Sequence, residues 1–145
     1  MVSLLDVNVL ISLAWPSHVH HDVAHNWFAG NSVNGWATCP LTQCAFLRIS
    51  SNPKIIPEAV SVQETLKVLE GFAKETHHVF WPDDLTVVES GFPSSLLLGH
   101  RQVADAYLLG LAIQNKGKLV TLDQDISALL PTKSPHRDAL RVIPC

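Results

Sequence analysis

Charged residues are scarce in this sequence, and basic residues do not outnumber acidic ones. Only 16% of the 145 residues are charged, and 10 Lys and Arg stand against 13 Asp and Glu, for a formal net charge of −3. A chain that is 47% hydrophobic and so poor in charge is not expected to be intrinsically disordered. Because there is no basic excess, the overall charge does not indicate a nucleic-acid-binding surface.

Cysteines are few, and long hydrophobic runs are missing. The three cysteines, Cys39, Cys44 and Cys145, are odd in number and match no zinc-binding spacing. We therefore expect reduced thiols in a cytoplasmic protein, with Cys39 and Cys44 buried. No apolar run is long enough to span a membrane. The N-terminus has neither a basic segment nor a small-residue cleavage site, so we expect no signal peptide.

The order of the short apolar segments predicts one α/β domain over residues 1–145. We expect strands at 2–5, 35–38, 79–81, 119–122 and 140–143, and helices at 8–15, 19–28, 41–49, 61–75, 101–114 and 126–130. Segments 50–57 and 91–99 contain turn-forming residues and are expected to be loops inside this domain. Strands that alternate with helices favour a mainly parallel sheet.

Two segments share one pattern, in which an apolar strand is followed by an aspartate and then by a helix. Asp6 follows the first expected strand, and Asp123 follows the fourth. Because the carboxyl ends of parallel strands lie along one edge of a sheet, where ligands bind, we expect the two side chains to come close together. Two carboxylates there repel each other unless a proton or a cation lies between them. Mg²⁺ or Mn²⁺, which prefer oxygen ligands, would fit such a site.

Asp105 is the third candidate, and it lies between two alanines at the margin of the apolar face of helix 101–114. Each aspartate has a simpler explanation when it is taken singly. Asp6 and Asp123 would cap the helices that follow them, and Asp105 would pair with Arg101 four residues earlier. Taken together they favour a metal site, because the two strand-end positions match in kind.

The segments that carry these aspartates resemble motifs of the PIN-domain nucleases. Leu4–Ile11 (LLDVNVLI) resembles the family's opening strand that ends in Asp-x-Asn, His100–Leu108 (HRQVADAYL) its central helix, and Thr121–Asp125 (TLDQD) its final Thr-x-Asp motif. Their order and spacing are similar to those of VapC-type toxins of toxin–antitoxin systems, over nearly the whole chain. The resemblance implies a PIN-like three-layer α/β/α fold, with a mainly parallel central sheet flanked by helices.

The same resemblance implies an Mg²⁺-dependent endoribonuclease that hydrolyses RNA phosphodiester bonds with a metal-activated water. Asp6 and Asp105 would be the principal ligands of Mg²⁺, which Mn²⁺ would replace, and Asp123 would complete the cluster directly or through water. Thr121 and Asn8 would orient a carboxylate or a water. The resemblance further implies a cognate VapB-type antitoxin and a homodimer. We expect a structured RNA such as tRNA as the substrate.

Gln43 departs from the family pattern. PIN nucleases usually have a glutamate at the start of the helix after the second strand, and Gln43 stands at that position within 40–48. A glutamine can coordinate a metal or orient water through its carbonyl oxygen, but it adds no negative charge and cannot act as a base. We therefore expect weaker ion binding, dependence on a single metal, or slow cleavage of bound RNA.

Because the chain has no overall basic excess, basic residues that bind phosphates would have to be gathered on one part of its surface. Without the three aspartates, ten acidic residues remain against ten basic ones. Five basic residues are candidates for a phosphate-binding patch: Arg48, Lys54, Arg101, Lys116 and Lys118.

Two other classes of function stay open. A catalytically weak PIN-like module that binds RNA or assembles is favoured by Gln43 and opposed by the three retained aspartates, since unneutralised buried carboxylates destabilise a fold. A phosphohydrolase-type α/β domain would want a second aspartate at position 8, which is Asn8 here.

His21 and His25 have the i, i+4 spacing that suits a transition metal. Because no third ligand is evident, we interpret them as surface residues of a helix.

Overall fold

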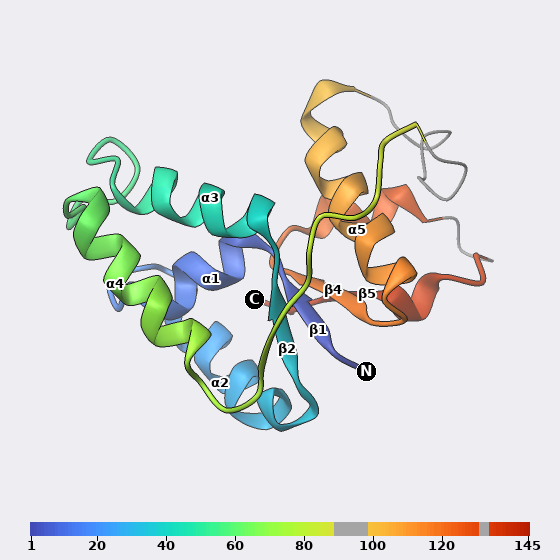
Figure 1. Cartoon of the computed structure of the whole chain (residues 1–145), viewed down its shortest axis with the longest axis horizontal. Helices are drawn as coiled ribbons and strands as arrows, with labels where there is room; N and C mark the ends of the chain where they lie inside the picture. The colour runs from blue at the N-terminus through green and yellow to red at the C-terminus, as the bar shows by residue number, and fades with distance from the viewer. Residues whose placement is uncertain (89–98, 131–133) are drawn as a thin grey trace.

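The computed structural model describes residues 1–88, 99–130 and 134–145. Within these ranges five strands form one sheet: β1 (Ser3–Leu5), β2 (Trp36–Thr38), β3 (His78–Phe80), β4 (Lys118–Thr121) and β5 (Leu140–Val142). Their order is β3-β2-β1-β4-β5, and every neighbouring pair is parallel. Figure 1 labels the strands β2, β1, β4 and β5 of this sheet. The prediction of a mainly parallel sheet is confirmed.

In the described part of the chain, five α-helices and several short 3₁₀ helices connect the strands. They are α1 (Val7–Ala14), α2 (His21–Asn31), η1 (Ser32–Asn34), α3 (Pro40–Ser50), α4 (Val62–Ala73), η3 (His100–Gln102), α5 (Val103–Gln114), η4 (Gln124–Leu129) and η5 (Arg137–Ala139). Asp6 and Ser61 begin α1 and α4 because their side chains accept hydrogen bonds from N–H groups of the first turn. Segment 126–130, predicted as a short helix, falls largely within the 3₁₀ helix η4.

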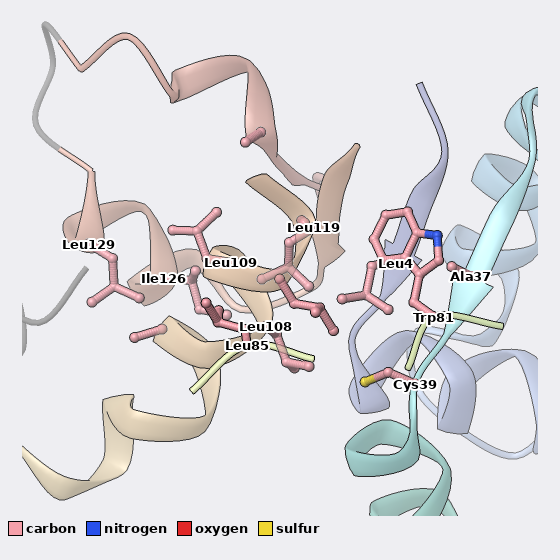
Figure 2. Packing of buried hydrophobic residues seen from close by; sticks show 14 of the residues in the cluster. Leu4, Ala37, Cys39, Trp81, Leu85, Leu108, Leu109, Leu119, Ile126 and Leu129 are labelled. Carbon is pink, nitrogen blue, oxygen red and sulfur yellow. The ribbon is translucent and has the colours of Figure 1, made fainter. Parts of the chain in front are cut away.

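Alternate strand residues belong to two cores, one on each side of the sheet. Leu4 and Leu119 cluster with residues of α5, whereas Leu5 and Val120 cluster with residues of α1 to α4. Successive side chains of a strand point to opposite faces, so a strand covered on both faces is apolar throughout. Figure 1 shows α1 to α4 on one side of the sheet and α5 on the other, and Figure 2 shows the α5-side core around Leu4 and Leu119. The expected three-layer α/β/α architecture is confirmed.

A tight turn between α5 and β4 fixes the register of the central strands. Lys116 has a positive φ of 56°, and Gly117 follows it. A Cβ atom at position 117 would lie 2.5 Å from the carbonyl oxygen of Val2 and 2.6 Å from Cη2 of Trp81, so only glycine fits there. The turn places Lys118 opposite Ser3, and β4 therefore ends beside β1.

One burial prediction is wrong. Cys39 is buried as expected, but Cys44 is exposed, because the buried face of α3 carries Thr42 and Phe46 and Cys44 points away from it. Most of the predicted loop 91–99 lies outside the described residues. No helix in the described part of the chain is long and apolar enough to cross a membrane.

Candidate active site

Asp6 lies where β1 ends and α1 begins, and only 5% of its surface is exposed. Its Oδ1 accepts a 2.7 Å hydrogen bond from the N–H of Val7 and so caps α1. Its Oδ2 accepts a 2.7 Å hydrogen bond from the Thr121 hydroxyl and a longer one of 3.4 Å from Nδ2 of Asn8. Capping therefore explains one carboxylate oxygen of Asp6, whereas the other faces the end of β4.

Asn8 and Thr121 join the ends of β1 and β4, which are adjacent parallel strands. Nδ2 of Asn8 donates to Oγ1 of Thr121 over 3.1 Å, and Oδ1 of Asn8 accepts from the N–H of Leu122 over 3.1 Å. Oγ1 of Thr121 also accepts a 3.0 Å hydrogen bond from the N–H of Asp123. These hydrogen bonds fix the position of Asp6 relative to the backbone of Asp123, although more than a hundred residues separate the two in the sequence.

Asp123 follows β4 at the same edge of the sheet. Its Oδ1 accepts a 2.9 Å hydrogen bond from the N–H of Asp125, which caps η4. The capping explanation therefore holds for Asp123 as it does for Asp6. The pairing of Asp105 with Arg101 stays a prediction, because the side chain of Arg101 lies outside the described part of the structure.

Asp105 projects from the first turn of α5 between two hollows at this edge of the sheet. The larger hollow, about 420 Å³, is lined by Asp105 and Asp123 together with residues of η3 and η4, among them His100. The smaller one, about 160 Å³, is lined by Asp105 and Asp6 together with residues of α3, among them Arg48. Three aspartates from three separate segments therefore line these two hollows at the carboxyl ends of the central strands, and Asp105 is common to both hollows.

The three carboxylates interact electrostatically. Burial, followed by the negative charges of Asp6 and Asp123, raises the pKa of Asp105 from 3.8 to about 6. Burial is also the main cause that raises the pKa of Asp6, and the charge of Asp123 adds to it, while the hydrogen bonds from Thr121 and Val7 lower it. A cation among these groups would relieve both the repulsion and the cost of burial.

The donors at this edge suit a hard divalent cation that keeps part of its hydration shell. Among the residues that the structure describes, no group of three or more His, Cys, Asp or Glu side chains is close enough to hold a metal ion by itself. Mg²⁺ usually binds through one or two carboxylates and retains several waters. Carboxylates that repel each other around open hollows fit that mode of binding better than a closed cage of protein ligands.

Gln43 lies at the same edge of the sheet but lines neither hollow. Its Nε2 donates a 3.0 Å hydrogen bond to Oγ1 of Thr38, and the same oxygen lies 2.7 Å from Nε2 of His78. This hydrogen bond directs the amide nitrogen toward the end of β2. The structure thus brings Asp6, Asp105 and Asp123 to two hollows at the same edge of the sheet and places Gln43 beside Thr38.

The five candidate basic residues do not form one patch. Arg48 lines the smaller hollow beside Asp6, as a phosphate-binding residue would. Lys118 begins β4 and Lys116 lies in the turn before it, so the length of the strand separates both from Asp123, which follows the other end. For these two lysines the prediction is wrong, because they lie at the opposite edge of the sheet from the three aspartates. His100, which lines the larger hollow, carried no signal in the sequence beyond its place in the motif before Asp105.

The fold and the sequence both match known proteins. The crystal structure of VapBC2 from Rickettsia felis bound to a DNA fragment from their promoter matches with a TM-score of 0.63, over 99% of this chain and 100% of that chain. At 14% sequence identity, this match supports the fold alone.

Sequence comparison finds closer relatives in Mycobacterium tuberculosis (strain ATCC 25618 / H37Rv). Ribonuclease VapC38 is 44% identical over 128 residues, which cover 88% of this chain and 89% of the relative. Ribonuclease VapC39 is 43% identical over 124 residues, covering 85% and 89%. Ribonuclease VapC29 is 38% identical over 139 residues, covering 91% and 98%. Residues 3–129 match the model of the PIN domain. The chain therefore belongs to the PIN domain family and, within it, to the VapC ribonucleases.

Proposed function

We propose that this protein is an endoribonuclease, the toxin of a toxin–antitoxin pair, and that it cleaves RNA where Asp6, Asp105 and Asp123 meet. The observation that carries the proposal is the position of Asp105, which shares one hollow with Asp6 and another with Asp123. Relatives that are named ribonucleases and cover most of the chain support the same activity.

In this proposal Asp6, Asp105 and Asp123 hold Mg²⁺, or Mn²⁺ in its place, directly or through waters. When bound, the ion would activate a water for attack on the phosphodiester bond and offset the charge of the phosphate. Thr121 and Asn8 keep Oδ2 of Asp6 oriented through their hydrogen bonds.

Two side chains of α3 have supporting roles. Arg48 contributes a positive charge at the smaller hollow, beside Asp6, where it would bind a phosphate of the RNA. Gln43 would orient water or its neighbours without adding charge, in keeping with its hydrogen bond to Thr38.

We also propose that residues 1–145 form a single domain that acts in the cytoplasm as a homodimer and is bound by a VapB-type antitoxin. The sheet includes strands from both ends of the chain, which supports one domain. Val62 and Leu66 on α4 are 51% and 42% exposed and offer an apolar surface for protein contacts. The structural neighbour from Rickettsia felis is itself a VapBC complex. A structured RNA such as tRNA is the proposed substrate.

Cleavage of total RNA and of a tRNA pool tests the activity. Wild type, Asp6→Asn, Asp105→Asn and Asp138→Asn would each be assayed with Mg²⁺, with Mn²⁺ and with EDTA. Asp138 is an exposed carboxylate on η5, outside both hollows, so Asp138→Asn is the matched control for the loss of one charge. We expect discrete cuts that need the metal. Cleavage should fall at least about a hundredfold in the two site variants, which is about 2.7 kcal/mol of transition-state stabilisation, and stay unchanged in the control.

Other outcomes would refute the proposal. Cutting that persists in EDTA or in Asp6→Asn would come from a contaminating ribonuclease. A folded protein that binds the ion but cuts no RNA would be an RNA-binding or assembly module. This is the second candidate function, and Gln43 in place of the usual glutamate favours it. Release of inorganic phosphate from small phosphomonoesters, without RNA cleavage, would indicate the phosphohydrolase class.

A further inference from the structure

Two histidines on successive turns of α2 lie against the end of α1, away from the candidate active site. Nδ1 of His21 lies 2.7 Å from the carbonyl oxygen of Ser12, and Nε2 of His25 lies 3.2 Å from that of Leu13. Their ring centroids are 4.3 Å apart, with an interplanar angle of 59°. The two carbonyl groups belong to the last turn of α1, whose carbonyls have no partner within the helix.

These contacts fix the tautomer of both rings. A carbonyl oxygen only accepts hydrogen bonds, so Nδ1 of His21 and Nε2 of His25 must each carry the proton. In the neutral rings, Nε2 of His21 and Nδ1 of His25 are therefore left with a free lone pair. Capping of α1 explains only one nitrogen of each ring. It leaves one unprotonated nitrogen on each of two rings whose centroids lie 4.3 Å apart.

The hydrogen bond that each ring makes to a carbonyl oxygen is typical of imidazoles that bind metals. A histidine that ligates a metal almost always donates its other ring N–H to a carbonyl or carboxylate, which sets the tautomer and the orientation of the ring. Both rings meet that condition before any ion is present. His25 is exposed and His21 half-buried, so an ion would reach the pair from solvent.

The neighbouring His18 does not meet the same condition. Its Nδ1 accepts a 3.1 Å hydrogen bond from the N–H of His20, so in the neutral ring the proton is on Nε2. Oγ of Ser12 also lies 3.2 Å from this Nδ1, but the same hydroxyl donates to the carbonyl of Asn8 over 2.7 Å. The ligand pair therefore consists of His21 and His25.

We propose that His21 and His25 form a chelating pair for a late first-row divalent ion such as Ni²⁺, Cu²⁺ or Zn²⁺, with water completing the coordination. Imidazole ligands favour these ions, whereas Mg²⁺ prefers oxygen donors. The site is thus chemically distinct from the aspartate site and independent of the nuclease activity. A bound ion draws electron density from the imidazoles and strengthens their N–H groups as donors to Ser12 and Leu13, so it tightens the junction of α1 with α2.

Titration of untagged protein with Ni²⁺ by calorimetry, in saturating Mg²⁺ so that the aspartate site is occupied, tests the proposal. His21→Asn and His25→Gln are the informative variants, because each places an amide nitrogen near the ring N–H that it replaces and preserves the carbonyl hydrogen bond. His136→Gln, at an exposed histidine before η5, is the control. Thermal unfolding with and without Ni²⁺ is the second readout.

We expect one Ni²⁺ per chain, together with a rise in the melting temperature. Affinity should drop more than about tenfold in His21→Asn and in His25→Gln, since even the loss of an outer-shell partner weakens a metal site by that much. The control should bind as the wild type does. No binding by the wild type, or equal binding by both variants while they remain folded, would overturn the proposal. RNA cleavage by these variants should match the wild type, so failure of this site and failure of the nuclease site are distinguishable.

Discussion

Replacing Asp105 by asparagine should stabilise the metal-free protein at neutral pH, although it removes a side chain from the candidate active site. Burial and the charges of Asp6 and Asp123 raise the pKa of Asp105 from 3.8 to about 6. A carboxyl group whose pKa is higher in the folded than in the unfolded chain binds its proton more tightly when folded. Its contribution to stability is therefore complete below pH 3.8 and is lost as the pH rises through about 6. Above that pH the ionised group opposes folding, and asparagine removes the opposition.

The magnitude follows from the same pKa change. Taken in full, the rise to about 6 corresponds to roughly 3 kcal/mol. We take about half of this, because the side chain is partly exposed and solvent screens its neighbours. Asp105→Asn should then raise the free energy of unfolding by about 1–1.5 kcal/mol at about pH 7.5. With a urea dependence of about 1.5 kcal/mol per molar, the unfolding midpoint should rise by about 0.7–1 M.

Urea unfolding in EDTA at about pH 7.5 and about pH 4 measures this difference directly. At the lower pH the gain should shrink to a few tenths of a kcal/mol, because Asp105 is then protonated in the folded wild type. Adding Mg²⁺ at neutral pH should stabilise the wild type more than the variant. Asp138→Asn, the exposed control, should stay within about 0.5 kcal/mol of wild type throughout. If Asp105→Asn shows no gain at neutral pH in EDTA, neither burial nor the neighbouring charges oppose the ionised carboxylate, and the electrostatic reason for a cation there is refuted.

Three further substitutions address the surroundings of the site and the fold. Thr121→Val removes the hydroxyl that donates to Asp6, so the pKa of Asp6 should rise. The acid limb of the pH–activity profile should then move to higher pH. The free energy of unfolding should fall by about 1–3 kcal/mol, because the hydrogen bond is lost. Thr121→Ser is the control, and identical profiles for all three proteins would contradict this role. Gln43→Glu adds a carboxylate at the same edge of the sheet and should lower the half-saturating Mg²⁺ concentration for cleavage at least about threefold. An unchanged Mg²⁺ dependence would show that the side chain at position 43 does not interact with the ion. Gly117→Ala should cost about 1–3 kcal/mol in thermal unfolding, because its Cβ would lie 2.6 Å from an indole carbon, while cleavage per folded molecule stays the same. Gly30→Ala, where a Cβ meets nothing within 4 Å, should not destabilise the protein, and an equal loss at both glycines would refute the steric explanation.

Local patterns in the sequence were sufficient to predict the elements and two of the three aspartates. The central strands β1, β2 and β4 are short, largely apolar runs covered on both faces, and such runs are recognisable without tertiary information. Asp6 and Asp123 each follow a strand and cap the helix after it, so their position at the sheet edge follows from parallel pairing alone. Asp105 lies inside a helix, and its place in the site was implied by the resemblance to PIN nucleases.

Tertiary structure alone decided which groups share the site and in what state. The hydrogen bond from Thr121 to Asp6 joins residues on two adjacent strands that are remote in sequence, and no local pattern specifies it. Lys118 is close to Asp123 in sequence but lies at the other end of β4, so the direction of the strand excludes it from the site.

The raised pKa of Asp105 and the fixed tautomers of His21 and His25 depend on burial and on partners that folding brings together. The sequence by itself therefore determined the fold class and the types of ligand available. The arrangement of these ligands, their charge and their free lone pairs depend on long-range packing, because electric fields and hydrogen bonds act across space and not along the chain.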